Sequence, residues 1–146
     1  MELDDKIALL YARVSTSMQV QDGISLEVQE RTLRQAAELA GYKNVQLIRE
    51  EGRSGKSIKG RPVLRKALLD LESGKAHALF VTRLDRLSRS TQDFLSIVDH
   101  SKTYDWRLVL LDLNLDTSSY QSRFVVTIMS ALAEMERSII SERQKD

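Results

Sequence analysis

Short, mainly apolar runs recur along this chain and are separated by longer amphipathic stretches. The runs cover residues 7–12, 45–48, 78–81 and 107–111. A run that is apolar on both sides of an extended chain is typical of a strand buried on both faces of an α/β sheet. The pattern therefore predicts four strands.

The amphipathic stretches between these runs carry helix signals. Ser25 is a suitable N-cap for a helix over residues 26–40. Pro62 suits the first position of a helix that ends at Gly74, and a third helix is expected to begin after Ser90. Strands alternating with helices predict an α/β domain with a mostly parallel sheet of about four or five strands, flanked by helices.

The last part of the chain has a different pattern. We expect residues 1–120 to form the α/β domain and residues 121–146 to begin a long oligomerisation helix, because nothing after residue 120 breaks a helix. This helix carries one main series of apolar residues, and further apolar residues lie beside it. One small sheet cannot cover all of them, so we expect a second subunit to cover the rest. The alternative is a helix that folds back on its own sheet. The series has coiled-coil spacing and consists of Val125, Ile128, Leu132, Met135 and Ile139.

Composition narrows the possible chemistry. A chain of 146 residues suffices for one domain with a real core. The sequence has no cysteine, which excludes disulfides and thiolate metal sites and is consistent with a cytoplasmic location. With only two histidines we expect neither a metal nor another cofactor. No apolar run has the length of a membrane span, so we expect no membrane partner. The net charge is +1, so affinity for nucleic acid would have to come from local clusters.

Candidate chemistry begins where the first predicted strand ends. Arg13 and Ser15 are two residues apart, so both point to the same side of an extended chain. Ligands of open α/β sheets bind at the carboxyl ends of the strands. We interpret Ser15 as a nucleophile and Arg13 as a phosphate clamp. The alternative is a strand followed by an ordinary polar turn.

A second polar cluster follows the strand predicted over residues 78–81. Arg83, Arg86 and Arg89 recur at a spacing of three around Asp85. Residues three apart share a face of a helical turn, and arginines packed together repel one another unless an anion neutralises them. Guanidinium groups bind phosphate through two parallel hydrogen bonds. The cluster therefore predicts a phosphate site, with arginines spread into water as the alternative.

Two further parts of the sequence, residues 49–61 and Gln29, are more polar than a purely structural role requires. Glycines and basic residues gather in residues 49–61, which predicts a loop that closes on a polyanion; the alternative is a solvated connection. Gln29 lies on the buried stripe of the helix over residues 26–40. It either caps a neighbouring loop or faces the site, and we favour the cap.

Three motifs together resemble the catalytic domain of the serine recombinases, the resolvase/invertase superfamily. They are Tyr11-Ala12-Arg13-Val14-Ser15-Thr16, the stretch Leu84-Asp85-Arg86-Leu87-Ser88-Arg89, and Glu136-Arg137. The resemblance covers nearly the whole chain. Residues 23–29, GISLEVQ, are most similar to the large serine integrases.

The resemblance implies a site-specific recombinase that needs neither metal nor ATP. Ser15 would attack a DNA phosphodiester to give a 5′-phosphoserine, and Asp85 would orient the arginines. Glu51 stands where the family pattern has an aspartate. The residues implied as catalytic are Ser15, Arg13, Asp85, Arg86, Arg89 and Gln19, and those implied as supporting or phosphate-binding are Tyr11, Ser54, Arg61, Arg83 and Gln29.

The resemblance also implies the partners. They are double-stranded DNA and further copies of the chain, as a homodimer and as a tetramer in the synaptic complex. Glu136 and Arg137 would lie at that interface with the apolar series. The DNA-binding domains that normally follow are expected to be absent from this stretch, and the gene is expected to belong to a phage or mobile element in a bacterial cell.

Two alternatives remain at this stage. A non-catalytic DNA-binding or oligomerisation module would use the arginines only to hold phosphate, but it has no need of Ser15 beside Arg13. An enzyme that transfers phosphoryl groups between small molecules would want a glycine-rich loop after the first strand, and residues 11–17 contain no glycine.

Overall fold

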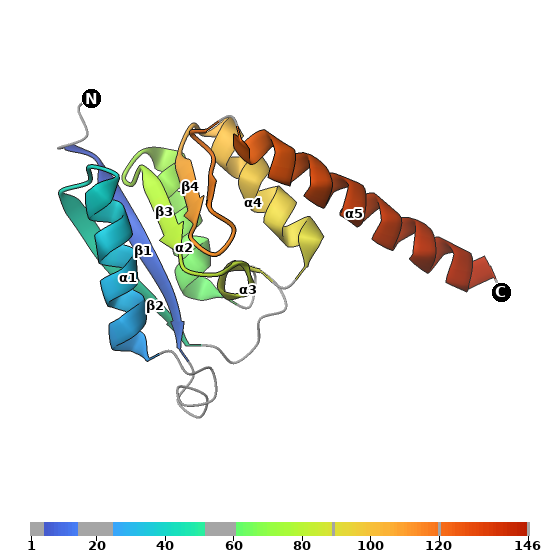
Figure 1. The fold of residues 1–146 in the computed structure, drawn as a ribbon, viewed down its shortest axis with the longest axis horizontal. Coiled ribbons are helices and arrows are strands. Elements are labelled where there is room, and N and C mark those ends of the chain that lie inside the picture. Colours follow the sequence, from blue (N-terminus) through green and yellow to red (C-terminus); the bar gives the residue numbers. More distant parts are fainter. Residues whose placement is uncertain (1–4, 15–24, 52–60, 89, 120, 146) are drawn as a thin grey trace.

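The computed structural model describes residues 5–14, 25–51, 61–88, 90–119 and 121–145. Strands and helices alternate through most of this chain (Figure 1). In order, the elements are β1 (Ile7–Val14), α1 (Leu26–Leu39), β2 (Asn44–Glu51), α2 (Pro62–Ser73), β3 (Ala78–Val81), α3 (Leu84–Leu87), α4 (Thr91–Thr103), β4 (Arg107–Leu110), β5 (Leu115–Asp116) and α5 (Gln121–Lys145).

The strands form one sheet with the order β2-β1-β3-β4-β5. β1 pairs in parallel with β2 and β3, β3 pairs in parallel with β4, and β5 runs antiparallel to β4. The predicted mostly parallel α/β sheet is thus confirmed. β5 lies in a stretch expected to be a loop, because two residues are too few to show a periodicity.

β1 and β2 extend further than their apolar runs. β2 continues past Ile48 to Glu51, so Arg49–Glu51, expected to open a loop, belongs to the strand, and Glu50 pairs with Arg13 of β1. Parallel pairing with β1 supplies backbone partners, which lets the strand continue through charged residues. This extension brings a basic and an acidic residue side by side at the carboxyl edge of the sheet.

Alternating side chains divide the core into two layers. Leu9 and Leu79 point to the face covered by α2 and α4, whereas Leu10 and Phe80 point to the face covered by α1 (Figure 1). All four side chains are buried. The sheet is therefore covered on both faces, which explains why β3 and residues 7–12 of β1 are mainly apolar at successive positions.

The predicted helix ends agree with the caps in the structure. Ser25 Oγ accepts a hydrogen bond from the N–H of Val28 at 3.2 Å, and Ser90 Oγ accepts one from the N–H of Asp93 at 2.9 Å. Gly74 ends α2 with φ of +85°, a conformation that a residue without a Cβ adopts at little cost. The serine caps of α1 and α4 are local, which is why the sequence predicts them.

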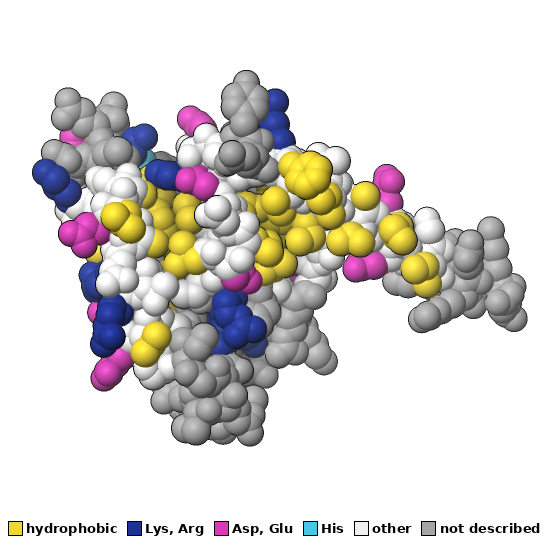
Figure 2. Space-filling model, viewed as in Figure 1, with side chains coloured by type: hydrophobic (Ala, Val, Ile, Leu, Met, Phe, Trp, Pro, Cys, Tyr) yellow, Lys and Arg dark blue, Asp and Glu magenta, His cyan; other side chains and the backbone are white. Residues whose placement is uncertain are grey.

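α5 has one face on the domain and one face exposed. Val126 and Met129 pack against the core, and Ala133 is buried. Val125, expected at a subunit interface, is half-buried and also packs against the chain's own core, so its place at an interface stays a prediction. A straight helix turns about 100° per residue, which moves Val125 towards the inner face. The exposed stripe runs along α5 in Figure 2 and consists of Phe124, Ile128, Leu132, Met135 and Ile139.

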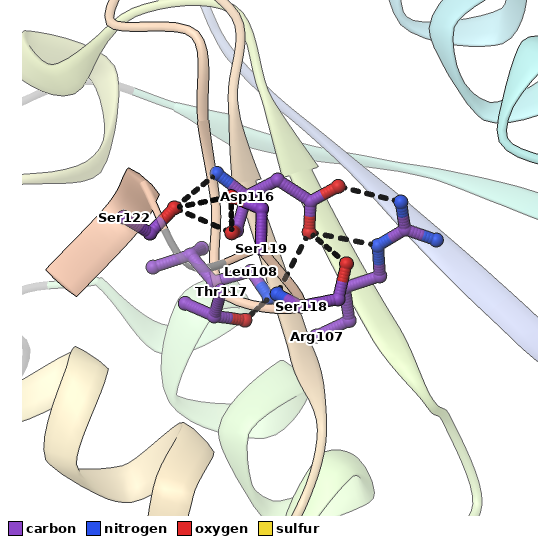
Figure 3. Close-up of polar contacts among 7 residues, drawn as sticks. All are labelled: Arg107, Leu108, Asp116, Thr117, Ser118, Ser119 and Ser122. Carbon is purple, nitrogen blue, oxygen red and sulfur yellow. Dashed lines mark hydrogen bonds and ion pairs between the residues drawn. The ribbon is translucent and has the colours of Figure 1, made fainter.

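A polar network joins β4 and β5 to the start of α5 (Figure 3). Arg107 pairs with Asp116 through Nε to Oδ1 at 2.9 Å and Nη2 to Oδ2 at 2.5 Å. Ser122 Oγ accepts from the N–H of Asp116 at 2.9 Å and donates to the carbonyl of Asp116. Burial alone would raise the pKa of Asp116, but hydrogen bonds from Arg107 and Ser118 hold it below its usual value. The network fixes where α5 begins.

We expect the Asp116→Asn variant to be less stable than the original chain at neutral pH. A carboxyl whose pKa is lower in the folded than in the unfolded state stabilises the fold above its unfolded pKa of about 3.9, and loses that effect as the pH falls. The difference in free energy of unfolding between the two chains should therefore shrink between pH 7 and about pH 3. Urea denaturation across this range measures it. Asp99→Asn, at an exposed position of α4, is the control, and an unchanging difference for Asp116→Asn would contradict the prediction.

Candidate functional site

The candidate site lies at the carboxyl ends of β1, β2 and β3. Arg13 is near the end of β1, Glu50 lies beside it on β2, and α3 follows β3 after two residues. Arg13 is 8% exposed and Glu50 is 2% exposed. Charged side chains are rarely buried unless they are paired, so the buried and neighbouring Arg13 and Glu50 mark this edge of the sheet as the candidate site.

The carboxylate of Glu50 connects three elements. Its Oε1 accepts hydrogen bonds from the Tyr11 hydroxyl at 3.1 Å and from the N–H of Leu64 at 2.9 Å. Its Oε2 accepts one from the N–H of Val63 at 3.1 Å. Glu50 of β2 thus caps the N-terminus of α2 and holds the tyrosine of β1.

Tyr11 is fully buried beside this carboxylate. Burial disfavours the phenolate, and the negative charge of Glu50 adds to the effect, so the pKa of Tyr11 is raised well above its usual value. The positive charges of Arg61 and Arg13 act in the opposite direction on the same hydroxyl, which places both guanidinium groups within electrostatic range. Tyr11 therefore serves as a neutral hydrogen-bond donor.

Arg61 directly precedes α2 and is 2% exposed. Its Nη1 donates to the carbonyl of Arg86 at 3.3 Å and to the carbonyl of Leu87. These carbonyls belong to the last two residues of α3, and carbonyls at the end of a helix have no N–H donor within the helix. Arg61 therefore joins the start of α2 to the end of α3 as well as bringing a positive charge to the site.

α3 is a single turn, held at both ends by residues from elsewhere. Asp112, just after β4, accepts a hydrogen bond from the N–H of Leu84 at 3.1 Å through Oδ2. Arg61 holds the other end. Arg83 directly precedes this turn and Arg86 lies within it, and both side chains are half-buried. The buried Ser88 follows the turn.

The structure brings together three of the predicted site residues, Tyr11, Arg13 and Arg61, and Arg61 also contacts the backbone carbonyl of a fourth, Arg86. Gln29 is 2% exposed, and its Oε1 has no hydrogen-bond partner in the part of the chain that the structure describes, so the favoured loop cap is not seen there. The placement of the nucleophile and of several partners stays a prediction. Outside the described residues lie Ser15, Gln19, Ser54 and Arg89, together with the side chain of Asp85.

Glu50 is the site residue that sequence reasoning missed. The expected acidic position was Glu51, but Glu51 is exposed, and the carboxylate at the site belongs to the residue before it. The available signal was the period of a strand: Glu50 is two residues after the partly buried Ile48, so both point to the same face. That signal was hidden because the strand was expected to end at Ile48.

The described residues include no group of three or more histidine, aspartate or glutamate side chains that could share a metal ion. None of the helices described combines the length and apolar character needed to cross a membrane.

The molecule is thus an α/β domain with two buried arginines, Arg13 and Arg61, and a buried carboxylate, Glu50, at the carboxyl edge of a mostly parallel sheet. The family described as "Resolvase, N terminal domain" matches residues 8–146. The chain therefore belongs to the resolvase family, and its resemblance to the serine recombinases is confirmed.

Individual relatives agree with this family. The chain is 37% identical over 133 residues to the DNA-invertase hin of Salmonella typhimurium, covering 91% of this chain and 62% of the invertase. It is 38% identical over 135 residues to the DNA-invertase of Escherichia phage P1, covering 92% and 64%. The crystal structure of the N-terminal catalytic domain of TP901-1 integrase matches with a TM-score of 0.80 at 34% identity, covering 92% of this chain and 98% of that one. The chain thus spans less than two thirds of either invertase but nearly all of the integrase domain.

We expect the Arg61→Met variant to lose stability even without any ligand. Methionine fills a similar volume but leaves the carbonyls of Arg86 and Leu87 without their donor, and a hydrogen bond from a charged group contributes about 1.5–3 kcal/mol. The free energy of unfolding, measured with urea, tests this. Arg65→Met, at an exposed position of α2, is the matched control. Equal stability of the two variants would show that Arg61 does not hold α3.

Proposed function

We propose that this chain is the catalytic domain of a serine site-specific recombinase, which cleaves and rejoins double-stranded DNA through a 5′-phosphoserine intermediate. One observation carries the proposal beyond family membership: Arg13 and Arg61 gather at the carboxyl end of β1, Arg61 binds the backbone of the turn that carries Arg86, and Ser15 is the first hydroxyl residue after that strand. Such a cluster suits a phosphodiester, because guanidinium groups match its oxygens in charge and geometry.

In the proposed reaction, Ser15 Oγ attacks the phosphorus of a DNA backbone phosphate. The bond from phosphorus to the 3′ oxygen breaks, the serine proton is released to solvent, and the 3′ oxygen takes up a proton. Rejoining is the reverse reaction with the 3′ hydroxyl of another strand. Because one phosphate ester is exchanged for another, the bond energy is kept and ATP is not required for rejoining.

The protein's contribution is to stabilise the charge that builds up on the phosphate oxygens during attack. The backbone of Arg13 is fixed in the sheet and that of Arg86 is bound by Arg61, so we expect both residues to need little rearrangement when the phosphate arrives. Arg89 would complete the set, and Asp85 would orient the arginines. Gln19, Ser54, Arg83 and Gln29 are proposed as supporting contacts.

We further propose that α5 joins subunits in a homodimer, and in a tetramer when two DNA sites are brought together. The exposed stripe includes Phe124 at 72% exposed and Met135 at 58% exposed. Burying a large apolar side chain contributes about 1.5–3 kcal/mol. Glu136 and Arg137 are also exposed and lie on α5 between Met135 and Ile139. Glu136 accepts a hydrogen bond from Thr91 at 3.4 Å.

The relatives are consistent with a protein encoded by a phage or another mobile element and acting on DNA in the bacterial cytoplasm. The two invertases above come from a bacterium and a phage. The competing function is a non-catalytic module that binds DNA or other subunits through the same arginines and the same helix. A covalent link between protein and DNA distinguishes the two, because a binding module forms none.

We expect the Ser15→Ala variant of the full-length protein to form no covalent product with a nicked suicide duplex carrying its recombination site. The alanine removes the proposed attacking oxygen and leaves the arginines in place, so DNA affinity should change by less than roughly threefold. Denaturing gels measure the adduct, and gel shifts measure affinity. Ser17→Ala is the control for a neighbouring hydroxyl. An adduct that persists in Ser15→Ala but disappears in Ser17→Ala would move the nucleophile.

We expect Leu132→Glu to weaken self-association of the chain. A charge in the centre of the exposed stripe would have to be buried when two copies meet, which costs several kcal/mol unless it is paired. Sedimentation equilibrium over a range of protein concentrations measures the association. Ser130→Glu, an exposed position away from the stripe, is the control. A parent chain that is monomeric at every concentration would overturn the assignment of α5 as an interface.

A further inference from the structure

We propose that Glu50 is a positioning residue for the recombination chemistry. By capping α2 it fixes Arg61, and through Arg61 it fixes the turn that carries Arg86. This inference rests on the proposed function, because it assigns Glu50 a role in that same reaction. Glu50 itself does not touch the DNA.

The first step of the argument is the cap on α2. The residue that precedes the helix, Arg61, makes no capping bond with its side chain, and Pro62 has no N–H to satisfy. The next two N–H groups, of Val63 and Leu64, both donate to the Glu50 carboxylate. A negative charge at a helix N-terminus is favourable, and hydrogen bonds to a charged acceptor are stronger than neutral ones. The start of α2 is therefore set by a residue of β2.

The other helices show that this arrangement is not needed for capping alone. α1 and α4 are each capped by the serine directly before them, Ser25 and Ser90. A local serine at position 61 could do the same for α2. The chain instead has a buried arginine there and a carboxylate from a neighbouring strand. The same carboxylate also holds Tyr11 of β1, so α2 is placed relative to the strand that leads to Ser15.

The second step runs from α2 to α3. The carbonyl of Arg61 accepts the N–H of Arg65 at 2.9 Å, so the backbone of Arg61 is fixed to the first turn of α2. Its side chain then reaches the carbonyls of Arg86 and Leu87. A helix of one turn has little stability of its own. The orientation of Arg86 therefore depends on where α2 begins.

Small displacements at this point have large effects on rate. A reacting group or its electrostatic partner displaced by about 1 Å can slow a reaction about 100-fold. Loss of the Glu50 cap would let the start of α2 shift, and Arg61 would carry that shift to Arg86. The expected consequence is slower chemistry with little change in DNA affinity, because phosphate contacts outside the turn are kept.

The test compares Glu50→Gln with the original full-length protein. A glutamine has one acceptor oxygen where the carboxylate has two, and its NH₂ group opposes the donors of α2. With a nicked suicide duplex carrying the recombination site, the single-turnover rate of adduct formation at saturating DNA should fall about 100-fold. The DNA concentration at half-saturation should change by less than roughly threefold. Glu50→Asp keeps the charge on a shorter side chain and should recover part of the rate.

A matched control separates positioning from general loss of stability. Leu68 is a core residue of α2 that makes none of these polar contacts. Leu68→Ala or Leu68→Val, whichever lowers the melting temperature as much as Glu50→Gln does, should react at nearly the original rate well below its melting temperature. Equal rates for Glu50→Gln and this control would overturn the proposal, as would a loss confined to DNA affinity.

A second measurement keeps this inference separate from the proposed function. Hydrogen exchange at the Ser88 amide, which donates to the carbonyl of Leu84 at 2.9 Å, reports on α3 without any DNA. Exchange there should be faster in Glu50→Gln and in Glu50→Asp than in the Leu68 control. If the original protein forms no adduct but this exchange difference is seen, the proposed function fails and the link from Glu50 to α3 stands. If exchange at Ser88 is the same in all variants, the link fails whatever the activity.

Discussion

The buried carboxylate of Glu50 is the interaction on which the rest of the site depends. A carboxylate taken out of water is unfavourable unless its oxygens are hydrogen-bonded, and here each oxygen accepts from the first turn of α2. Because the chain can bury this charge only with α2 and Tyr11 in place, the geometry of the sheet edge is tied to the fold itself. Positive charge can then accumulate around it, since the carboxylate offsets part of the repulsion between Arg13 and Arg61.

The predictable and unpredictable parts of the structure differ in the distance over which residues interact. Ser25 caps α1 from three residues away, and an apolar run predicts a strand from its own residues, so both are visible in a short window of sequence. Glu50 caps α2 from 14 residues away, and Asp112 holds the start of α3 from 28 residues away. No local pattern indicates such contacts, because they exist only after the sheet has set the strands side by side.

The distance over which residues interact also explains why some residues of the site are predicted from the sequence and Glu50 is not. Arg13 and Arg86 are predicted because they follow apolar runs, and the parallel sheet brings the ends of those strands together. Tyr11 and Arg61 are predicted only from the resemblance to the serine recombinases. Glu50 is not predicted, because the change from apolar to charged residues after Ile48 indicates the end of a strand, whereas β2 continues through these charges with backbone partners from β1. Val125 is half-buried and packs against its own domain, which the sequence does not indicate because spacing alone does not say which face of a helix the domain covers.

The hydrogen bonds of Ser122 at the start of α5 affect where the far end of this helix lies. α5 runs from Gln121 to Lys145, and a helix rises about 1.5 Å per residue, so its far end lies about 35 Å from Ser122. A change of about 10° in the direction of α5 at that point would displace its far end by about 6 Å, more than the length of one helical turn. In the proposed dimer, the register between the subunits would therefore be sensitive to a few hydrogen bonds around Asp116.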